Sequence, residues 1–501
     1  MGSGSFLLSH RAVSRSSYLS FTLAVVVAAA FVAGCGGSAG GSSGTGPTLS
    51  GYTAVTVLAT STANARLSDF VMSIEGVTLT SQSGKTVVLL SAPLYHEFIH
   101  LNGSPEPLVF TSIPQDVYTS ATVTISDGEF TCMAKDPSSS LLEVARYSVR
   151  SIGPSDVTVT LPQPITVTGT SMGLLLNLLV SKSASFPSTC YTPGVASFSI
   201  TPNFSITPVT ISNQPTNSAN GKVLSLHGQI SSVTASSNLI NVVGADGRAV
   251  DSPTWPFIVN SSTVFQGVTG ISQLTAGMPV DMDVAIQQRG PMLATRVSVY
   301  DTDTTDLNIF TGPIYMLLAS QPELEAYPQE QQGYLSQSAY YPSADDDISN
   351  AEFKISGALA NLQSLPFTAS FSAANMVPGQ YASITTHVTY YMSGYPPAET
   401  VTLMPQTING TVSAISTQGG FATYTVTLAP YDLFPVAANA LYEVSRLTSP
   451  NTVVVYADSN AQKLTTNPIA VGSVVRFYGL VFNDNGTLRM DCAQINDGVA
   501  L

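Results

Sequence analysis

The chain has 501 residues, of which 17 are basic and 31 acidic, so its formal net charge at pH 7 is −14. Such an acidic chain is a poor partner for nucleic acid, because binding to phosphates depends on Lys and Arg. Charged residues make up 10% of the chain against about 25% in average proteins, and hydrophobic residues reach 44%, which excludes an intrinsically disordered protein. The length predicts three or four domains.

Residues 1–34 are typical of a secretory signal peptide. Arg11 and Arg15 precede an apolar run that is shorter than the roughly 20 residues of a membrane-spanning helix. The run ends in Val-Ala-Gly-Cys, which resembles the lipobox of bacterial lipoproteins and implies cleavage before Cys35 and attachment of lipid to its sulfur. The alternative is a plain signal peptide with an incidental cysteine. We expect a lipid-anchored protein of the cell envelope, in the outer membrane, with a flexible Gly- and Ser-rich tether at 35–50.

Residues 51–211 form alternating apolar and polar runs separated by turn-forming residues, which predicts a β-sandwich or a barrel. The segments Glu97–Gly103 and Ile113–Thr119 resemble the bacterial domain of unknown function 4382, with a strand, an Asn-Gly turn and a Pro-x-x-x-Tyr corner. This resemblance implies an immunoglobulin- or transthyretin-like β-sandwich, and it brings no known activity. The apolar run 173–180 is too short to span a membrane and predicts a buried strand.

Three cysteines remain beside Cys35. Cys132 and Cys190 fall in the same predicted domain of an exported protein, so we expect a disulfide between them. Cys492 lies in an alternating segment near the C-terminus, where a lone cysteine usually acts as a small buried apolar side chain.

The rest of the chain contains landmarks that recur three times in the same order. One glycine opens a strand, a second glycine precedes a later strand, and an alternating strand closes the unit. The first glycine is Gly228, Gly312 or Gly410, and the second is Gly277, Gly379 or Gly472. The pattern resembles the bacterial domain of unknown function 5666, which implies a small β-barrel. We therefore expect an all-β protein with barrel-like repeats at 221–302, 303–408 and 409–501.

His96, Glu97 and His100 match the H-E-x-x-H pattern of zinc metallohydrolases, and Gly103 and Glu106 extend the match. That chemistry needs a helix, because only then do the two histidines share one face. The neighbouring proline and the Asn-Gly turn favour a strand instead, in which the two histidines would lie about 13 Å apart. A secreted zinc metallohydrolase stays an alternative function. The preferred interpretation has no catalytic residue, no bound metal and no cofactor.

The middle repeat carries an insert at 322–349 that is rich in tyrosine and aspartate. Aromatic side chains on a loop can anchor a protein or stack on a sugar, so we expect Tyr334, Tyr340 and Tyr341 to bind envelope proteins or glycans. The acidic runs 301–306 and 345–347 predict solvated loops, with calcium binding as the alternative. The sequence thus predicts a non-catalytic, lipid-anchored scaffold or binding module of the cell envelope.

Overall fold

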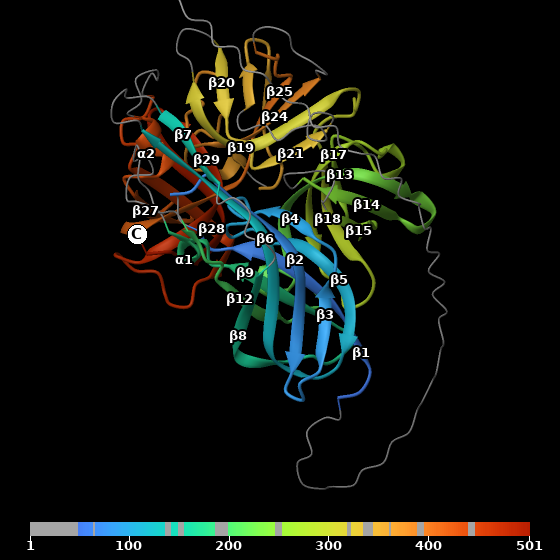
Figure 1. Cartoon of the computed structure of the whole chain (residues 1–501). Coiled ribbons are helices and arrows are strands. Elements are labelled where there is room, and N and C mark those ends of the chain that lie inside the picture. The colour runs from blue at the N-terminus through green and yellow to red at the C-terminus, as the bar shows by residue number, and fades with distance from the viewer. Residues whose placement is uncertain are drawn as a thin grey trace, which may run out of the picture. The chain divides into compact units, whose positions relative to one another are not determined.

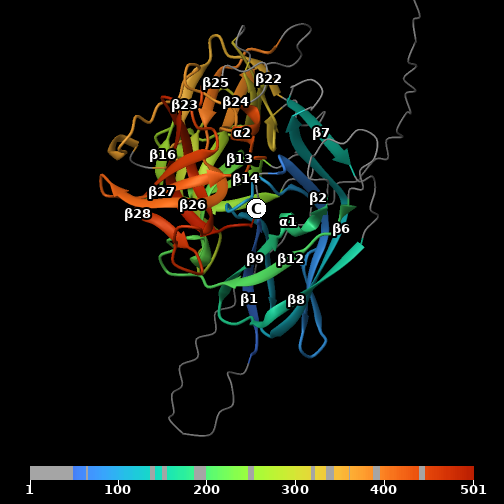
Figure 2. The same ribbon diagram turned by 90° about the vertical axis from the view of Figure 1, so that its left-hand side faces the viewer.

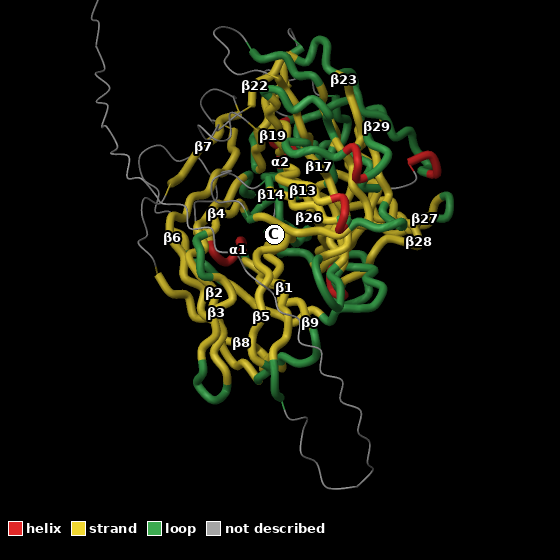
Figure 3. Tube along the Cα trace, turned by 90° about the vertical axis from the view of Figure 1, so that its right-hand side faces the viewer, coloured by secondary structure: helices red, strands yellow, loops and turns green. Residues whose placement is uncertain are grey.

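The structure is a computed structural model that describes residues 49–63, 66–135, 142–148, 155–185, 199–245, 253–317, 322–333, 344–359, 362–387, 395–438 and 446–500. Residues from Leu49 to Leu501 form one compact unit. The fold is all-β, as predicted: Figures 1 and 3 show strands throughout, with α1 (Val180–Ser183) and α2 (Leu433–Ala437) as short helices. Single 3-10 turns occur at η1 (Ser218–Asn220), η2 (Ala235–Ser237), η3 (Ile271–Gln273) and η5 (Leu362–Ser364). Within these ranges, no helix has the length and apolar character that crossing a membrane requires.

The N-terminal part is a sandwich of two β-sheets that enclose a common apolar core (Figure 2). The first sheet has the order β12-β9-β1-β5, with β1 antiparallel to β5 and parallel to β9. Its strands are β1 (Tyr52–Ser61), β5 (Glu106–Pro114), β9 (Ser171–Leu178) and β12 (Phe204–Val209). The second sheet has the order β3-β2-β6-β7, with β4 added on β2 and β8 on β6. Its strands are β2 (Asp69–Ser81), β3 (Thr86–Leu90), β4 (Leu94–Glu97), β6 (Val117–Lys135), β7 (Leu142–Ser148) and β8 (Ser155–Thr166), and a separate pair is β10 (Ala184–Ser185) with β11 (Ser199–Ile200).

The first sheet of the sandwich is covered on both faces. Val57 and Leu176 face the sandwich core, whereas Leu58, Phe110 and Leu175 pack on the core of the first repeat. A strand that is buried on both sides is largely apolar, and β9 confirms the strand predicted at 173–180 as far as Leu178, whereas Val180 begins α1. The expected tyrosine corner is also present, because the Tyr118 hydroxyl donates a hydrogen bond of 2.8 Å to the carbonyl of Pro114.

Three β-units follow the sandwich, and they share one pattern of strand pairing. In each, the opening strand is antiparallel to the strand after the second glycine, and the closing strand also pairs in parallel with an earlier strand. The first has β13 (Lys222–Thr234), β14 (Leu239–Gly244), β15 (Thr254–Ile258), β16 (Val264–Gln266), β17 (Pro279–Ala285) and β18 (Met292–Val299). The second has β19 (Leu307–Leu317), β20 (Glu323–Ala326), β21 (Glu330–Gly333), β22 (Ala344–Asp347), β23 (Glu352–Ile355), β24 (Tyr381–His387) and β25 (Thr400–Leu403). The third is a closed barrel of β26 (Gln406–Gln418), β27 (Phe421–Leu428), β28 (Thr452–Leu464), β29 (Val474–Asp484) and β30 (Thr487–Asp497).

The second glycine of each unit occupies an equivalent place. All three have a left-handed backbone with φ between +91° and +96°, which residues with a side chain rarely adopt. The N–H groups of Gly277, Gly379 and Gly472 each donate a 2.8 Å hydrogen bond to a carbonyl of the opening strand. The turn before the strand that pairs with the opening strand is therefore built in the same way in each unit.

The first glycine is required for a different reason. A Cβ atom at Gly228 would lie 2.5 Å from the carbonyl oxygen of Val243, and one at Gly410 would lie 2.6 Å from that of Thr427. The neighbouring strand thus approaches too closely for any side chain, and a Cβ at Gly312 would collide with the backbone of Tyr327 in the same manner. The first glycine recurs in each repeat because the neighbouring backbone lies too close to accept a side chain.

Segment 322–349 differs from the expected surface insert. It supplies β20 and β21, which both pair with β19, and β22, which pairs with β20. Tyr327 is fully buried, and Asp346 is only 1% exposed on β22, so the expectation of a solvated acidic loop at 345–347 was wrong for this residue. Tyr334, Tyr340 and Tyr341 lie outside the described residues.

The cysteine predictions are tested in one case. Cys492 is a free, buried thiol on β30, as expected, and burial raises the pKa of this thiol. Cys35, Cys190 and the side chain of Cys132 lie outside the described part of the structure, so the lipid attachment and the disulfide stay predictions.

Candidate functional site

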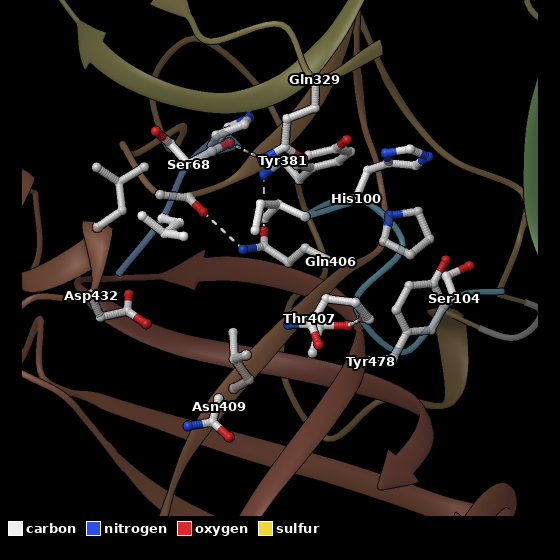
Figure 4. Close-up of a pocket in the computed structure, with 18 of the residues that line it drawn as sticks. Ser68, His100, Ser104, Gln329, Tyr381, Gln406, Thr407, Asn409, Asp432 and Tyr478 are labelled. Atoms are coloured by element: carbon white, nitrogen blue, oxygen red, sulfur yellow. Dashed lines mark hydrogen bonds between the residues drawn. The ribbon is translucent and has the colours of Figure 1, made fainter. Parts of the chain in front are cut away.

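A pocket of about 140 Å³ lies where side chains of the sandwich and of the three β-units meet (Figure 4). The sandwich contributes the turn between β4 and β5, and the second unit contributes β21 and β24. The third contributes the start of β26 and helix α2. Its charged lining residues are Arg66, His100, Glu106, His227, Glu330 and Asp432, and its tyrosines are Tyr381, Tyr431 and Tyr478.

Hydrogen bonds across the chain hold the walls of this pocket together. The Tyr327 hydroxyl of the second unit donates to Asp69 of the sandwich at 2.9 Å. The Arg476 guanidinium of the third unit donates to the side chain of Asn102 at 2.6 Å. Because these groups are buried and paired, the pocket is preorganised.

His100 lines the pocket on the side of the sandwich, and Glu97 supports it from behind. The Glu97 carboxylate, 1% exposed, accepts hydrogen bonds from the backbone N–H groups of Phe70, Ile99 and His100 at 2.7–2.9 Å. It also lies 2.9 Å from Nδ1 of His100, and this contact orients the imidazole with Nε2 toward Glu106. Burial lowers the pKa of His100, but the Glu106 carboxylate and its acidic neighbours more than offset burial, so this pKa lies well above its usual value.

The H-E-x-x-H pattern does not lie on the helix that a zinc metallohydrolase needs. His96 and Glu97 end strand β4, whereas His100 lies in the turn that follows. The prediction of a strand through both histidines is therefore right only as far as Glu97, and no helix brings the two histidines to one face. The His96 ring is fully buried against Phe98, with ring centroids 6.0 Å apart, and it does not line the pocket. Glu97 holds the backbone and the ring of His100 in place.

His227 and Glu330 form the neighbouring part of the wall, and Glu330 lies close to His100. Nδ1 of His227 lies 2.9 and 2.8 Å from the two carboxylate oxygens of Glu330, and the Tyr381 hydroxyl donates to the same carboxylate at 3.3 Å. Burial raises the pKa of Glu330, but the charge of His227 outweighs burial and lowers it. Burial lowers the pKa of His227, and the Glu330 carboxylate more than offsets this and raises it to about 9.

A chain of hydrogen bonds runs from Ser225 through His227 to Glu330, as in a serine hydrolase triad. The Ser225 hydroxyl lies 3.2 Å from Nε2 of His227. A hydrolase also needs backbone N–H groups free to stabilise an oxyanion beside the serine. The N–H of Ser225 instead donates to the Asp283 carboxylate at 3.1 Å. The arrangement therefore supports a structural hydrogen-bond chain better than acyl transfer.

A buried ion network lies directly behind Ser225. Nη2 of Arg296 contacts Oδ1 of Asp281 at 2.8 Å and Oδ1 of Asp283 at 2.9 Å, and Ser356 of the second unit donates to Asp281 at 3.0 Å. Burial lowers the pKa of Arg296, but the two aspartates raise it further, so the guanidinium stays charged. This network joins the first unit to the second.

Asp432 caps helix α2 at the edge of the pocket. Its carboxylate accepts a 3.2 Å hydrogen bond from the N–H of Phe434. Burial raises the pKa of this carboxyl to about 7, so its proton is exchangeable near neutral pH. It can therefore donate or accept a hydrogen bond to a ligand.

The acidic side chains of the run 301–306 do not converge on one point as in a calcium-binding loop. Asp301 and Glu399 instead contact Nε2 of His387 at 3.4 and 3.1 Å, and imidazole nitrogen is not a usual calcium ligand. The Asp301 and His387 side chains are 15% and 20% exposed and Glu399 is 57% exposed, which is the exposure expected of a surface ion pair.

Sequence reasoning reached His100 and Glu106 but missed Ser225, His227, Glu330 and Tyr381. His227 directly precedes Gly228 of the repeat landmark, which was the one local signal for it. Comparisons with models of protein families and with curated proteins found no match for this chain, so both family resemblances stay predictions and the site must be interpreted from its own geometry.

Proposed function

We propose that the protein is a non-catalytic, lipid-anchored cell-envelope protein that binds a sugar, such as the terminal unit of an envelope glycan, in this pocket. The observation that carries the proposal is a preformed pocket in which tyrosines and carboxylates face the same space. Ligand sites typically combine apolar or aromatic walls with a few fixed polar groups.

The size and lining of the pocket suit one sugar ring. A cavity of about 150 Å³ accommodates a benzene ring, so this pocket of about 140 Å³ has room for one six-membered ring, with the hydroxyl groups of the sugar directed at its polar lining and its opening. Tyrosine rings offer flat surfaces for the C–H face of a sugar, and carboxylates are strong acceptors for its hydroxyl groups. Tyr381, Tyr478, Glu330 and Asp432 provide both kinds of group.

Obstruction of the pocket tests the proposal. Val436 lies on α2, lines the pocket and is half-buried, so the Val436→Trp variant should fill the space and weaken sugar binding at least about tenfold, or 1.4 kcal/mol. Calorimetric titration of the full chain with neutral hexoses and N-acetylhexosamines, as mono- and disaccharides, provides the measurement.

The matched control is Val88→Trp, since Val88 is 54% exposed on β3 and does not line the pocket. This variant should bind like the wild type. The proposal fails when no sugar of the panel binds, or when Val436→Trp binds as tightly as Val88→Trp.

The lipid anchor is tested separately. The Cys35→Ser variant is expected to lose all acyl labelling and to keep its leader, because the lipid is attached through the thiol and cleavage follows lipidation. Metabolic labelling with a fatty acid analogue and the mass of the isolated protein give the result. Cys492→Ser is the control and should label normally, since this cysteine is buried; normal labelling of Cys35→Ser would refute the anchor.

A further inference from the structure

We propose that His100, Glu106 and Glu330 bind one divalent transition-metal ion, of which zinc is the best example, at the wall of the pocket. One nitrogen of His100 and one oxygen of each glutamate lie within 4.8 Å of one another. Ligands that surround a single ion at about 2.0–2.2 Å are separated by no more than such distances. The three residues come from the β4–β5 turn, from β5 and from β21.

The first argument is the state of the His100 imidazole. Its side chain is 6% exposed, and Nε2 has no hydrogen-bond partner among the described residues. Nε2 lies 3.6 Å from Oε1 of Glu106, which is beyond hydrogen-bond distance. This buried nitrogen faces carboxylate oxygens of Glu106 and Glu330, so the place between them favours a positive charge, which a bound metal ion would supply.

The second argument is the support behind the ligands. Histidine ligands of metals usually donate their other N–H to a carboxylate, and Nδ1 of His100 contacts Glu97 at 2.9 Å. Glu97 is itself held by backbone N–H groups. The Glu330 carboxylate is held in turn by His227 and Tyr381. His100 and Glu330 are thus each held from behind, and one atom of each lies within 4.8 Å of a carboxylate oxygen of Glu106.

The third argument concerns which ion fits. Imidazole nitrogen favours zinc and other late first-row metals, whereas calcium and magnesium prefer oxygen ligands alone. Two carboxylates and one neutral imidazole would balance the charge of a divalent ion. Three protein ligands leave at least one coordination position free, and all three residues line the pocket, so this position is directed at whatever the pocket holds.

This site goes beyond the proposed sugar binding, and either can fail alone. The metal ligands lie on the sandwich and on β21, whereas the obstruction test uses α2. Loss of sugar binding in Val436→Trp would leave metal binding intact, and loss of the metal would not by itself remove the tyrosine walls.

The experiment is metal binding by the full chain, isolated in detergent, freed of metal with a chelator and titrated with zinc. Cobalt serves as a second probe because its visible absorption reports the coordination geometry. We expect one zinc ion per chain for the wild type and at least a 100-fold weaker affinity for Glu106→Gln and for His100→Gln. We expect a 10- to 100-fold loss for Glu97→Gln, which removes only the support of His100.

His387→Gln is the matched control, because His387 belongs to the other cluster of one histidine and two acids, with Asp301 and Glu399, which lies at a more exposed place. It should bind zinc like the wild type. Thermal unfolding of each variant without metal separates loss of the site from loss of the fold, and Glu106→Gln keeps the size of the side chain. The proposal is overturned when the wild type binds no zinc at 100-fold excess, or when folded Glu106→Gln binds as tightly as the wild type.

Discussion

Replacement of Arg296 by methionine is expected to destabilise the protein by about 3–5 kcal/mol, the usual effect of removing one partner from a buried ion pair. The Arg296 side chain is 8% exposed and contacts both Asp281 and Asp283. Methionine fills much of the same volume but leaves two carboxylates in the interior without their cation. Asp281, which is fully buried, would then bear most of the cost.

The midpoint of urea unfolding, measured at pH 7, is the appropriate readout. The matched control is Arg489→Met, which breaks a more exposed ion pair with Asp484 and should cost no more than about 1 kcal/mol. A double variant with Asp281→Asn should be less destabilised than Arg296→Met alone, because one of the stranded charges is removed. Equal midpoints for Arg296→Met and Arg489→Met would contradict the role of the buried network.

The Asp346→Asn variant is expected to be more stable than the wild type at alkaline pH. Asp346 is 1% exposed, and neither of its carboxylate oxygens has a hydrogen-bond partner among the described residues. Burial, with a smaller contribution from Asp345, raises the pKa of this carboxyl to about 8. The folded protein therefore holds a proton that the unfolded chain releases near pH 4.

Protonated Asp346 contributes fully to stability at a pH below the pKa of this side chain in the unfolded chain. The contribution is lost as the pH rises through about 8, the pKa of Asp346 in the folded protein. A tenfold change in proton affinity corresponds to about 1.4 kcal/mol, so the wild type should lose on the order of 4 kcal/mol between pH 5 and pH 9 from this group. Asparagine does not titrate, and the difference in unfolding free energy between the two proteins should widen by that amount.

Asp347→Asn is the control for this experiment, because a hydrogen bond from Ser349 lowers the pKa of Asp347. A lowered pKa contributes stability that is already complete above pH 4, so no additional gain is expected between pH 5 and pH 9. Parallel stability curves for Asp346→Asn and the wild type over this pH range would show that Asp346 is already ionised in the folded protein.

The fold class could be predicted because local chemistry determines it. Alternation specifies strands, and the glycines recur where backbone geometry permits no side chain, as at Gly228 and Gly277. Such requirements act within a few residues of the chain, so a single sequence displays them. The strand predicted in the apolar run 173–180 is present as far as Leu178, since burial on both faces favours apolar residues along most of its length.

The site could not be predicted in the same way. His100 and Glu106 stand six residues apart and were noticed, but only in the geometry of a helix, whereas a turn brings them together. Glu330 is more than 200 residues away, in a segment interpreted as a surface insert. Charge alone suggested that Asp346 is solvated, because no local signal shows that a short strand of three aspartates will be covered by the rest of the fold.

The first sheet of the sandwich packs against two apolar cores, and this affects how the chain folds. β1 needs β9, more than 100 residues later, as its parallel neighbour, and its other face stays uncovered until the first unit supplies Val223 and Trp255. Pairings so distant in sequence slow folding, because a long loop must close before any contact rewards it. During synthesis from the N-terminus, Leu58, Phe110 and Leu175 therefore form an exposed, aggregation-prone apolar surface until Trp255, 80 residues after Leu175, has been made. We therefore expect the sandwich, which ends at residue 211, to complete its folding only together with the first β-unit.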